Sequence, residues 1–220
     1  QTFLWSNSQT TDSIINLTAG LYTVSTNSNG CTTIDSVFIN EPPLLTATTN
    51  ISNVSCSGGT DGSITFNING GNSAYILNVN NTIQSLSQGI TTYSTPSSLS
   101  AGAYPYTITD NNGCEQVFNI TLNEPPAISV SPIITDVFCT GGNAGNITAV
   151  VSGGVGNGNA NNYTYQWFSG NPPTGTLIAG ETSYFIDNLP SGNYYIEVTD
   201  ANGCYDIYKD SVVPFVCVYY

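Results

Sequence analysis

Alternating apolar and polar residues recur in short runs along the whole chain. Three clear runs cover residues 63–68, 104–109 and 194–199, where every second side chain is apolar. This period of two predicts β-strands with one buried face, and no window has the spacing of an amphipathic helix. Asn-Gly follows two of these runs, at 112–113 and 202–203, and further alternating runs come next, at 116–122 and 205–208. Because Asn-Gly tolerates positive φ, each pair of runs is predicted to form a β-hairpin.

The same motifs return in one register, which indicates tandem repeats. Leu-x-(Ala/Ser)-Gly-x-Tyr occurs three times and ends at Tyr22, Tyr104 and Tyr194. Each copy is followed by Asn-Gly-Cys, and the cysteines Cys31, Cys114 and Cys204 are 83 and then 90 residues apart. Glu-Pro-Pro occurs at 41–43 and 124–126, and Cys-x-Gly-Gly at 56–59 and 139–142. We expect the C-terminal half of a truncated repeat at 1–43, complete repeats at 44–126 and 127–216 (the latter with a loop insertion), and the start of a further segment at 217–220.

Repeats of about 85 residues with some seven short strands are typical of an immunoglobulin-like β-sandwich. The predicted fold class is therefore all-β, with tandem immunoglobulin-like repeats in an extended array. Tyr22, Tyr104 and Tyr194 are expected to form tyrosine corners, in which the phenol bonds back to the backbone. Trp5 and Trp167 stand where such a sandwich has its core tryptophan, and the middle repeat has Leu77 there. The paired prolines of Glu-Pro-Pro fix φ and predict short, stiff junctions.

The composition excludes several classes of function. The chain has 14 acidic residues, one lysine (Lys209), no arginine and no histidine, which gives a net charge of −13. Without a basic patch it cannot neutralise phosphates, so no nucleic-acid binding is expected. Without histidine there is no Ser-His-Asp triad and no imidazole metal site. No apolar run reaches the roughly 18 residues of a membrane span, so no direct membrane insertion is expected. We predict that the protein is not an enzyme.

Six cysteines without a Cys-x-x-Cys motif indicate an oxidising, extracellular setting. We expect the early and late cysteines of each complete repeat to pair, Cys56 with Cys114 and Cys139 with Cys204. Each bond would close a loop of about 60 residues and contribute roughly 4 kcal/mol by chain entropy. Cys31 and Cys217 are expected to pair outside the fragment. A Cys31–Cys217 bridge between neighbouring chains is an alternative.

Two groups of residues are candidates for a ligand site, and each also has a simpler structural explanation. Asp61, Asp110 and Asp200 lie in acidic turns that could bind Ca²⁺, but the repeats do not keep all three, so turn formation is the favoured interpretation and no cofactor is expected. Tyr163, Phe168 and Tyr184 lie in an aromatic-rich repeat beside the Gly- and Asn-rich insertion at 153–162. They could form a glycan-binding face, with ordinary core packing as the alternative.

Taken as a set, the motifs resemble those of a known family. Cys-x-Gly-Gly-x-x-Gly-x-Ile, the Gly-Gly pairs at 70–71 and 153–154, Leu-x-x-Gly-x-Tyr, Thr-Asp-x-Asn-Gly-Cys and Glu-Pro-Pro are similar to the SprB-type repeats of Bacteroidetes gliding-motility adhesins and giant cell-surface proteins. The resemblance implies long polypeptides secreted by the type IX system and displayed as surface filaments. Asp-Ser-(Ile/Val), at Ser13, Ser36 and Ser211, also resembles the O-glycosylation motif of that phylum.

The sequence therefore predicts a segment of an extracellular surface filament or adhesin, which would serve adhesion and gliding motility. Its expected partners are neighbouring repeats of the same long chain or filament, and surface polysaccharide. The alternative is a glycan-binding accessory region of a large secreted enzyme.

Overall fold

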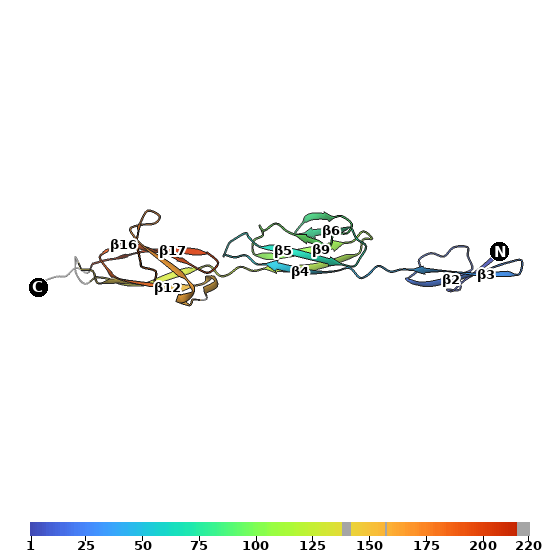
Figure 1. The fold of residues 1–220 in the computed structure, drawn as a ribbon, viewed down its shortest axis with the longest axis horizontal. Helices are drawn as coiled ribbons and strands as arrows, with labels where there is room; N and C mark the ends of the chain where they lie inside the picture. Colours follow the sequence, from blue (N-terminus) through green and yellow to red (C-terminus); the bar gives the residue numbers. More distant parts are fainter. Residues whose placement is uncertain (138–141, 157, 215–220) are drawn as a thin grey trace. The chain divides into compact units, whose positions relative to one another are not determined.

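The computed structural model describes residues 1–137, 142–156 and 158–214 (Figure 1). This part of the chain forms 17 β-strands and two short 3₁₀ turns, and it contains no α-helix. No helix in the described residues has the length and hydropathy needed to cross a bilayer. The chain divides into two compact units, one formed by Gln1–Thr48, Asn67–Thr91 and Thr107–Val117, the other by Thr49–Phe66, Thr92–Tyr106 and Phe118–Tyr220.

The N-terminal residues form one antiparallel sheet in the order β1-β2-β3. Its strands are β1 (Thr2–Trp5), β2 (Gly20–Ser28) and β3 (Cys31–Ile39). The β2–β3 hairpin closes at Asn29 and Gly30, whose φ values are 53° and 84°. Positive φ at both central residues is the requirement of a type I′ turn, and it explains why Asn-Gly stands here.

The middle repeat contains seven strands in two sheets. One sheet has the order β4-β5-β8 and the other β10-β9-β6-β7. The strands are β4 (Thr46–Ser52), β5 (Ser63–Asn69), β6 (Tyr75–Val79), β7 (Thr82–Leu86), β8 (Thr92–Ser94), β9 (Gly102–Thr109) and β10 (Glu115–Leu122). Phe66 of β5 meets Tyr106 of β9 edge to face, with ring centroids 4.7 Å apart, so apolar side chains of the two sheets meet between them.

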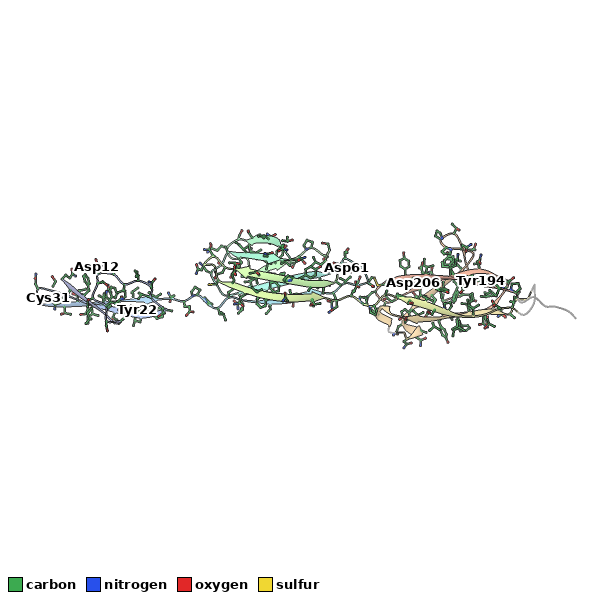
Figure 2. All side chains as sticks on the ribbon, turned by 180° about the vertical axis from the view of Figure 1, so that it is seen from behind. Asp12, Tyr22, Cys31, Asp61, Tyr194 and Asp206 are labelled. Carbon is green, nitrogen blue, oxygen red and sulfur yellow. A yellow bond between two sulfur atoms is a disulfide. The ribbon has the colours of Figure 1, made fainter. Side chains whose placement is uncertain are left out.

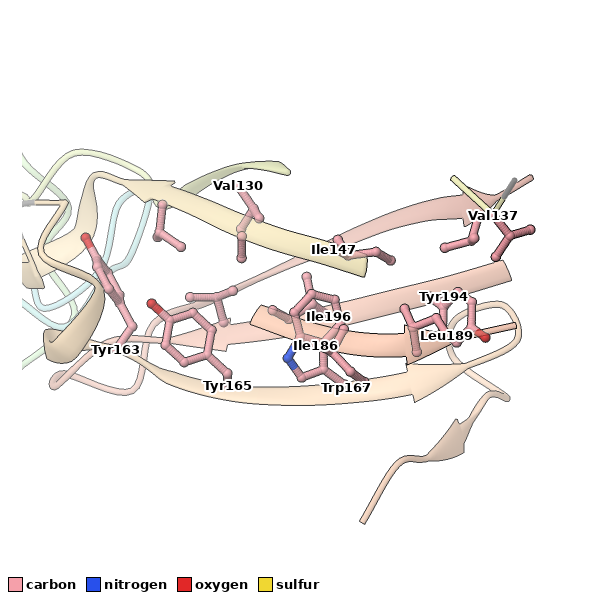
Figure 3. Close-up of a cluster of buried hydrophobic side chains, with 14 residues drawn as sticks. Val130, Val137, Ile147, Tyr163, Tyr165, Trp167, Ile186, Leu189, Tyr194 and Ile196 are labelled. Atoms are coloured by element: carbon pink, nitrogen blue, oxygen red, sulfur yellow. The ribbon is translucent and has the colours of Figure 1, made fainter. Parts of the chain in front are cut away.

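The third repeat has the same arrangement, with sheets β11-β12-β15 and β14-β13-β16-β17. Its elements are β11 (Ser129–Thr135), β12 (Gly145–Ser152), η1 (Gly154–Gly156), η2 (Ala160–Asn162), β13 (Thr164–Ser169), β14 (Thr176–Leu177), β15 (Phe185–Leu189), β16 (Gly192–Thr199) and β17 (Tyr205–Val212). Inward side chains of both sheets fill the space between them, around Trp167, which is 1% exposed (Figure 3). Two sheets with these strand orders make an immunoglobulin-like sandwich, so the predicted fold class is confirmed.

Candidate functional site

The Asn-Gly-Cys segments of the two complete repeats lie in the loops of the predicted β-hairpins, β9–β10 and β16–β17, and a buried carboxylate holds each loop. Asp110 Oδ1 accepts hydrogen bonds from the backbone N–H of Asn112 (2.9 Å) and Cys114 (2.8 Å), and its Oδ2 accepts from Asn72 N–H (2.9 Å). The Asn72 N–H is the main reason why the pKa of Asp110 lies below its ordinary value. The carboxylate therefore fixes the backbone of Cys114 and ties this loop to the turn at Asn72.

Asp200 repeats this arrangement in the third repeat. It accepts from the N–H groups of Asn202 (2.9 Å), Cys204 (3.0 Å) and Val155 (3.0 Å). Asp110 and Asp200 are both buried and already bonded to three backbone donors each. Among the described residues, no three His, Cys, Asp or Glu side chains gather as a metal site would require.

Each of these loops lies next to a Gly-Gly turn that contacts the Pro-Pro linker. Gly71 N–H donates to Pro43 O (2.7 Å), and Gly154 N–H donates to Pro126 O (2.8 Å). Gly70 and Gly153 have φ values of 74° and 79°. A Cβ at Gly70 would collide with the carbonyl oxygen of Leu44, and one at Gly153 with that of Ala127. Only glycine permits this close backbone approach, which explains why the Gly-Gly pair recurs.

The linker, the Gly-Gly turn and the Asp-anchored loop together make a structure that we call the linker platform. It occurs twice, once around Cys114 and once around Cys204. Each platform lines a hollow. Both hollows are lined by the two linker prolines, the two residues after them, the second glycine of the Gly-Gly turn, and the cysteine with the residue two positions after it.

The Cys-x-Gly-Gly segment that begins at Cys56 is a tight turn next to the second platform. Gly59 N–H donates to Cys56 O (2.9 Å), and Gly58, with φ at 71°, occupies the position where a type II turn requires positive φ. Gly58 N–H also donates to Glu124 Oε2 (2.7 Å). The glutamate of Glu-Pro-Pro thus holds the turn by a charge-assisted hydrogen bond.

Cys56 forms a disulfide with Cys204, 148 residues further along the chain. Next to this bond, Asn202 Nδ2 donates to Ser55 O (2.9 Å). The structure therefore corrects both predicted pairings, Cys56 with Cys114 and Cys139 with Cys204. Cys31 and Cys114 are free and exposed. Cys139 and Cys217 lie outside the described residues.

The length of β10 explains why Cys56 does not pair with Cys114. Cys114 immediately precedes β10, whereas the residues flanking Cys56 bond to the chain just after it, through Val54 N–H to Asn123 O (3.0 Å) and Gly58 N–H to Glu124. The eight residues of β10 rise about 3.3 Å each, or about 26 Å in total. A disulfide tolerates no more than about 7 Å between Cα atoms, so cysteines at opposite ends of β10 cannot bond.

The recurring tyrosines all bond to the backbone four residues before them. Tyr104 Oη donates to Ser100 O (2.9 Å), Tyr194 Oη to Pro190 O (2.9 Å) and Tyr22 Oη to Thr18 O (3.1 Å); Tyr22 and Tyr194 are labelled in Figure 2. This is the geometry of a tyrosine corner. Burial raises the pKa of Tyr194 above its ordinary value.

The two tryptophans have different environments. Trp167 lies in the core, where its indole N–H donates to Ser183 O (2.9 Å). The corresponding position of the middle repeat is Leu77, which is fully buried. Trp5 is only half-buried, and its indole N–H donates to Thr11 O (2.9 Å).

The structure does not bring the three glycan-site candidates together as exposed rings. Tyr163 is buried, and its hydroxyl donates to Gly153 O (2.6 Å), so this ring supports the Gly-Gly turn and is a correction to the predicted site. Phe168 is half-buried and stacks on Tyr195, with ring centroids 4.4 Å apart. Tyr184 is exposed and lies edge to face with the exposed ring of Phe185 at 5.4 Å.

The three serines of the Asp-Ser motif are at least partly accessible. Ser13 and Ser36 are exposed, and Ser211 of β17 is half-buried. In two of them the aspartate accepts from the backbone N–H of the serine, at 2.8 Å for both Asp35–Ser36 and Asp210–Ser211. Asp61, the remaining acidic candidate, accepts from Ser55 N–H (3.0 Å), and hydrogen bonds from Ser55 lower its pKa.

Sequence reasoning missed Glu124 and Asn202 as the residues that hold the Cys56 turn. The available signal was their recurrence, because Glu-Pro-Pro and Asn-Gly-Cys both appear more than once. Their partners, however, lie 66 and 147 residues away in the sequence, so no local pattern identifies them.

Comparison with known families finds one family model that matches two stretches of the chain. Residues 48–76 and 131–172 match the family model described as SprB repeat. Both stretches are similar to SprB repeats. The first matched stretch contains the Cys56 turn and the Gly-Gly turn of the middle repeat, and the second contains the Gly-Gly turn and Trp167 of the third. The resemblance predicted from the motifs is therefore confirmed. No curated protein matches the sequence.

The chain is also similar to several solved structures, and its match spans less than two thirds of the length of two of them, Hoc and Sidekick-1. The three N-terminal domains of the Hoc outer capsid protein of bacteriophage RB49 are 16% identical, with a TM-score of 0.42, and the match covers 78% of this chain and 58% of that one. Three immunoglobulin domains of titin are 13% identical, with a TM-score of 0.42, over 98% and 88% of the two chains. Immunoglobulin domains 1–5 of Sidekick-1 are 14% identical, with a TM-score of 0.37, over 98% and 52%.

Proposed function

We propose that the chain is a structural segment of an extracellular filament or adhesin, with a mechanical rather than a catalytic role. The observation that carries this proposal is the presence of SprB repeats, which belong to cell-surface proteins, in immunoglobulin-like sandwiches. The Cys56–Cys204 disulfide supports an oxidising, extracellular location. Adhesion and gliding motility are the functions that this role would serve, with neighbouring repeats and surface polysaccharide as partners. Export by the type IX system and O-glycosylation at the Asp-Ser motifs remain predictions.

Immunogold electron microscopy of the source cells tests the proposal. Antibody raised against residues 44–216 should place gold along thin surface fibres, and antibody adsorbed with the purified chain should remove that label. Gold absent from fibres, with the antigen in soluble secreted material, would contradict the filament role.

The second candidate function is glycan binding within a large secreted protein, and the exposed pair Tyr184 and Phe185 favours it. Exposed aromatic rings offer apolar faces against which a sugar ring can pack. A glycan array with the purified chain and its Tyr184→Ala variant separates the candidates. Binding that the variant loses would support a glycan site, and an array without signal would leave the mechanical role as the proposal.

A further inference from the structure

The platforms around Cys114 and Cys204 are built from the same parts, yet their cysteines differ in bonding. Cys204 is bonded to Cys56, whereas Cys114 is free and exposed. Three residues hold the Cys56 turn at the second platform: Glu124 through Gly58 N–H, Asn202 through Ser55 O, and Cys204 through sulfur. The first platform has the same three residue types at matching positions, and its hollow is lined by Glu41, Asn112 and Cys114.

We propose that the hollow beside Cys114 is a docking site for the Cys-x-Gly-Gly turn of another SprB repeat, which it captures as a disulfide. SprB repeats would then be joined by bonds from the early cysteine of one repeat to the late cysteine of the next. This proposal concerns how repeats connect, and it holds whether or not the chain acts in adhesion.

The three anchors explain why this partner fits the site. Glu41 is an exposed carboxylate. It would accept a hydrogen bond from the N–H of the first glycine of a docked turn, as Glu124 accepts one from Gly58. Asn112 Oδ1 accepts a hydrogen bond from Asn72 Nδ2 (2.8 Å). Its Nδ2 would donate to the docked turn, as Asn202 Nδ2 donates to Ser55 O. The backbone of Cys114 is held by Asp110 in the way that Asp200 holds Cys204.

The docked turn must also have glycine at both positions of its Gly-Gly pair. Gly58 has positive φ, which L-residues with side chains rarely adopt. A Cβ at Gly59 would lie 2.9 Å from Val54 Cγ1. A partner without Gly-Gly would therefore not present its cysteine and its N–H in the geometry of the Cys56 turn.

Bond formation is a thiol–disulfide exchange. The thiolate of Cys114 attacks a disulfide that carries the partner cysteine, the new sulfur–sulfur bond forms, and the other sulfur leaves as a thiolate. Overall, two cysteine thiols are oxidised to one disulfide, and a small or protein disulfide is reduced to two thiols. The oxidant is thus a disulfide-bearing compound or oxidoreductase of the extracellular space.

A peptide with the sequence of residues 53–60, with its cysteine in a mixed disulfide with a small thiol, is the probe. It is equilibrated with the intact chain, and mass spectrometry of chymotryptic fragments gives the exchange constant at each cysteine. Cys31 is the matched control, because it is also exposed and follows Asn-Gly, but lies in a type I′ hairpin without a platform. We expect the exchange constant at Cys114 to exceed that at Cys31 by about tenfold or more, the order of effect of a charge-assisted hydrogen bond.

Two further measurements separate docking from simple thiol reactivity. A control peptide with alanine in place of both glycines should exchange at Cys114 no better than at Cys31. Glu41→Gln keeps the shape of the side chain and should lower the Cys114 constant about tenfold while the Cys31 constant stays unchanged. Equal constants at the two cysteines, equal behaviour of the two peptides, or a Cys114 constant that Glu41→Gln does not change would each overturn the proposal. The peptide comparison decides it even if the variant does not fold.

Discussion

The Cys56–Cys204 bond joins the middle and third sandwiches, so its removal should destabilise both. When the third sandwich unfolds alone, the bond closes a loop of about 80 residues from the linker to Cys204, and chain entropy then contributes about 4 kcal/mol. When the middle sandwich unfolds alone, the loop runs from Cys56 to the linker over about 70 residues and again contributes about 4 kcal/mol. The double variant Cys56→Ser/Cys204→Ser should lose this amount from the free energy of unfolding of each sandwich.

The assay must report on the two sandwiches separately. Hydrogen exchange measured by mass spectrometry across a urea series does so, with peptides from β5 for the middle sandwich and from β16 for the third. A urea m-value of about 1–2 kcal/mol/M for a domain of this size converts the loss into a midpoint shift of about 2 M or more for each. The matched control is Cys31→Ser/Cys114→Ser, which removes two cysteines that are free in the structure and should leave both midpoints unchanged.

The alternative, pairing within repeats, gives a different outcome. Cys114→Ser would then lower the midpoint of the middle sandwich, and Cys204→Ser would lower only that of the third. A midpoint loss confined to the third sandwich in the single Cys204→Ser variant, or a large loss in the Cys31→Ser/Cys114→Ser control, would refute the reasoning.

Three further predictions concern single side chains. Hydrogen bonds hold the pKa of Asp110 below its ordinary value, so the ionised carboxylate stabilises the fold above about pH 4. This stabilisation is lost as the pH falls towards the lower folded pKa. In Asp110→Asn the melting temperature should therefore fall less steeply than in the wild type between pH 6 and pH 2. Tyr194→Phe removes the bond to Pro190 O and should cost about 1 kcal/mol in urea unfolding followed by Trp167 fluorescence. Trp167→Ala should cost about 3–5 kcal/mol by calorimetry, whereas Tyr184→Ala, at an exposed position, should change stability by no more than about 0.5 kcal/mol.

The strands and the core were predictable because they depend on local pattern. The alternation at 104–109 and 194–199 corresponds to β9 and β16, whose inward residues are buried, and Tyr104 and Tyr194 bond as their motif predicts. Tyr163 shows the limit of this approach. A Gly-rich insertion beside aromatic residues suggested an exposed face, but Tyr163 is buried together with Tyr165 and Trp167, spaced two residues apart.

The disulfide and its anchors could not be predicted from the same information. Early and late cysteines recur with each repeat, so spacing does not say whether an early cysteine pairs within its own repeat or with the next one. The choice depends on which end of β10 each cysteine occupies, and that is a property of the folded sandwich. Asp110 was recognised as a turn residue, but its bond to Asn72, 38 residues away, makes it also the link between the loop and the Gly-Gly turn.

A bond between repeats has a mechanical consequence that a bond within a repeat lacks. If the chain is held at residues before Cys56 and after Cys204, tension passes from Cys56 through the two sulfur atoms to Cys204. Residues 57–203, which include the Pro-Pro linker and the strands from β5 to β16, then lie on a closed loop that carries no tension. Within the two bonded sandwiches, force acts on β4 and β17, the strands that lie outside this loop. Most of both cores is thereby protected from forced unfolding, which is the property that a segment of a surface filament under load would need.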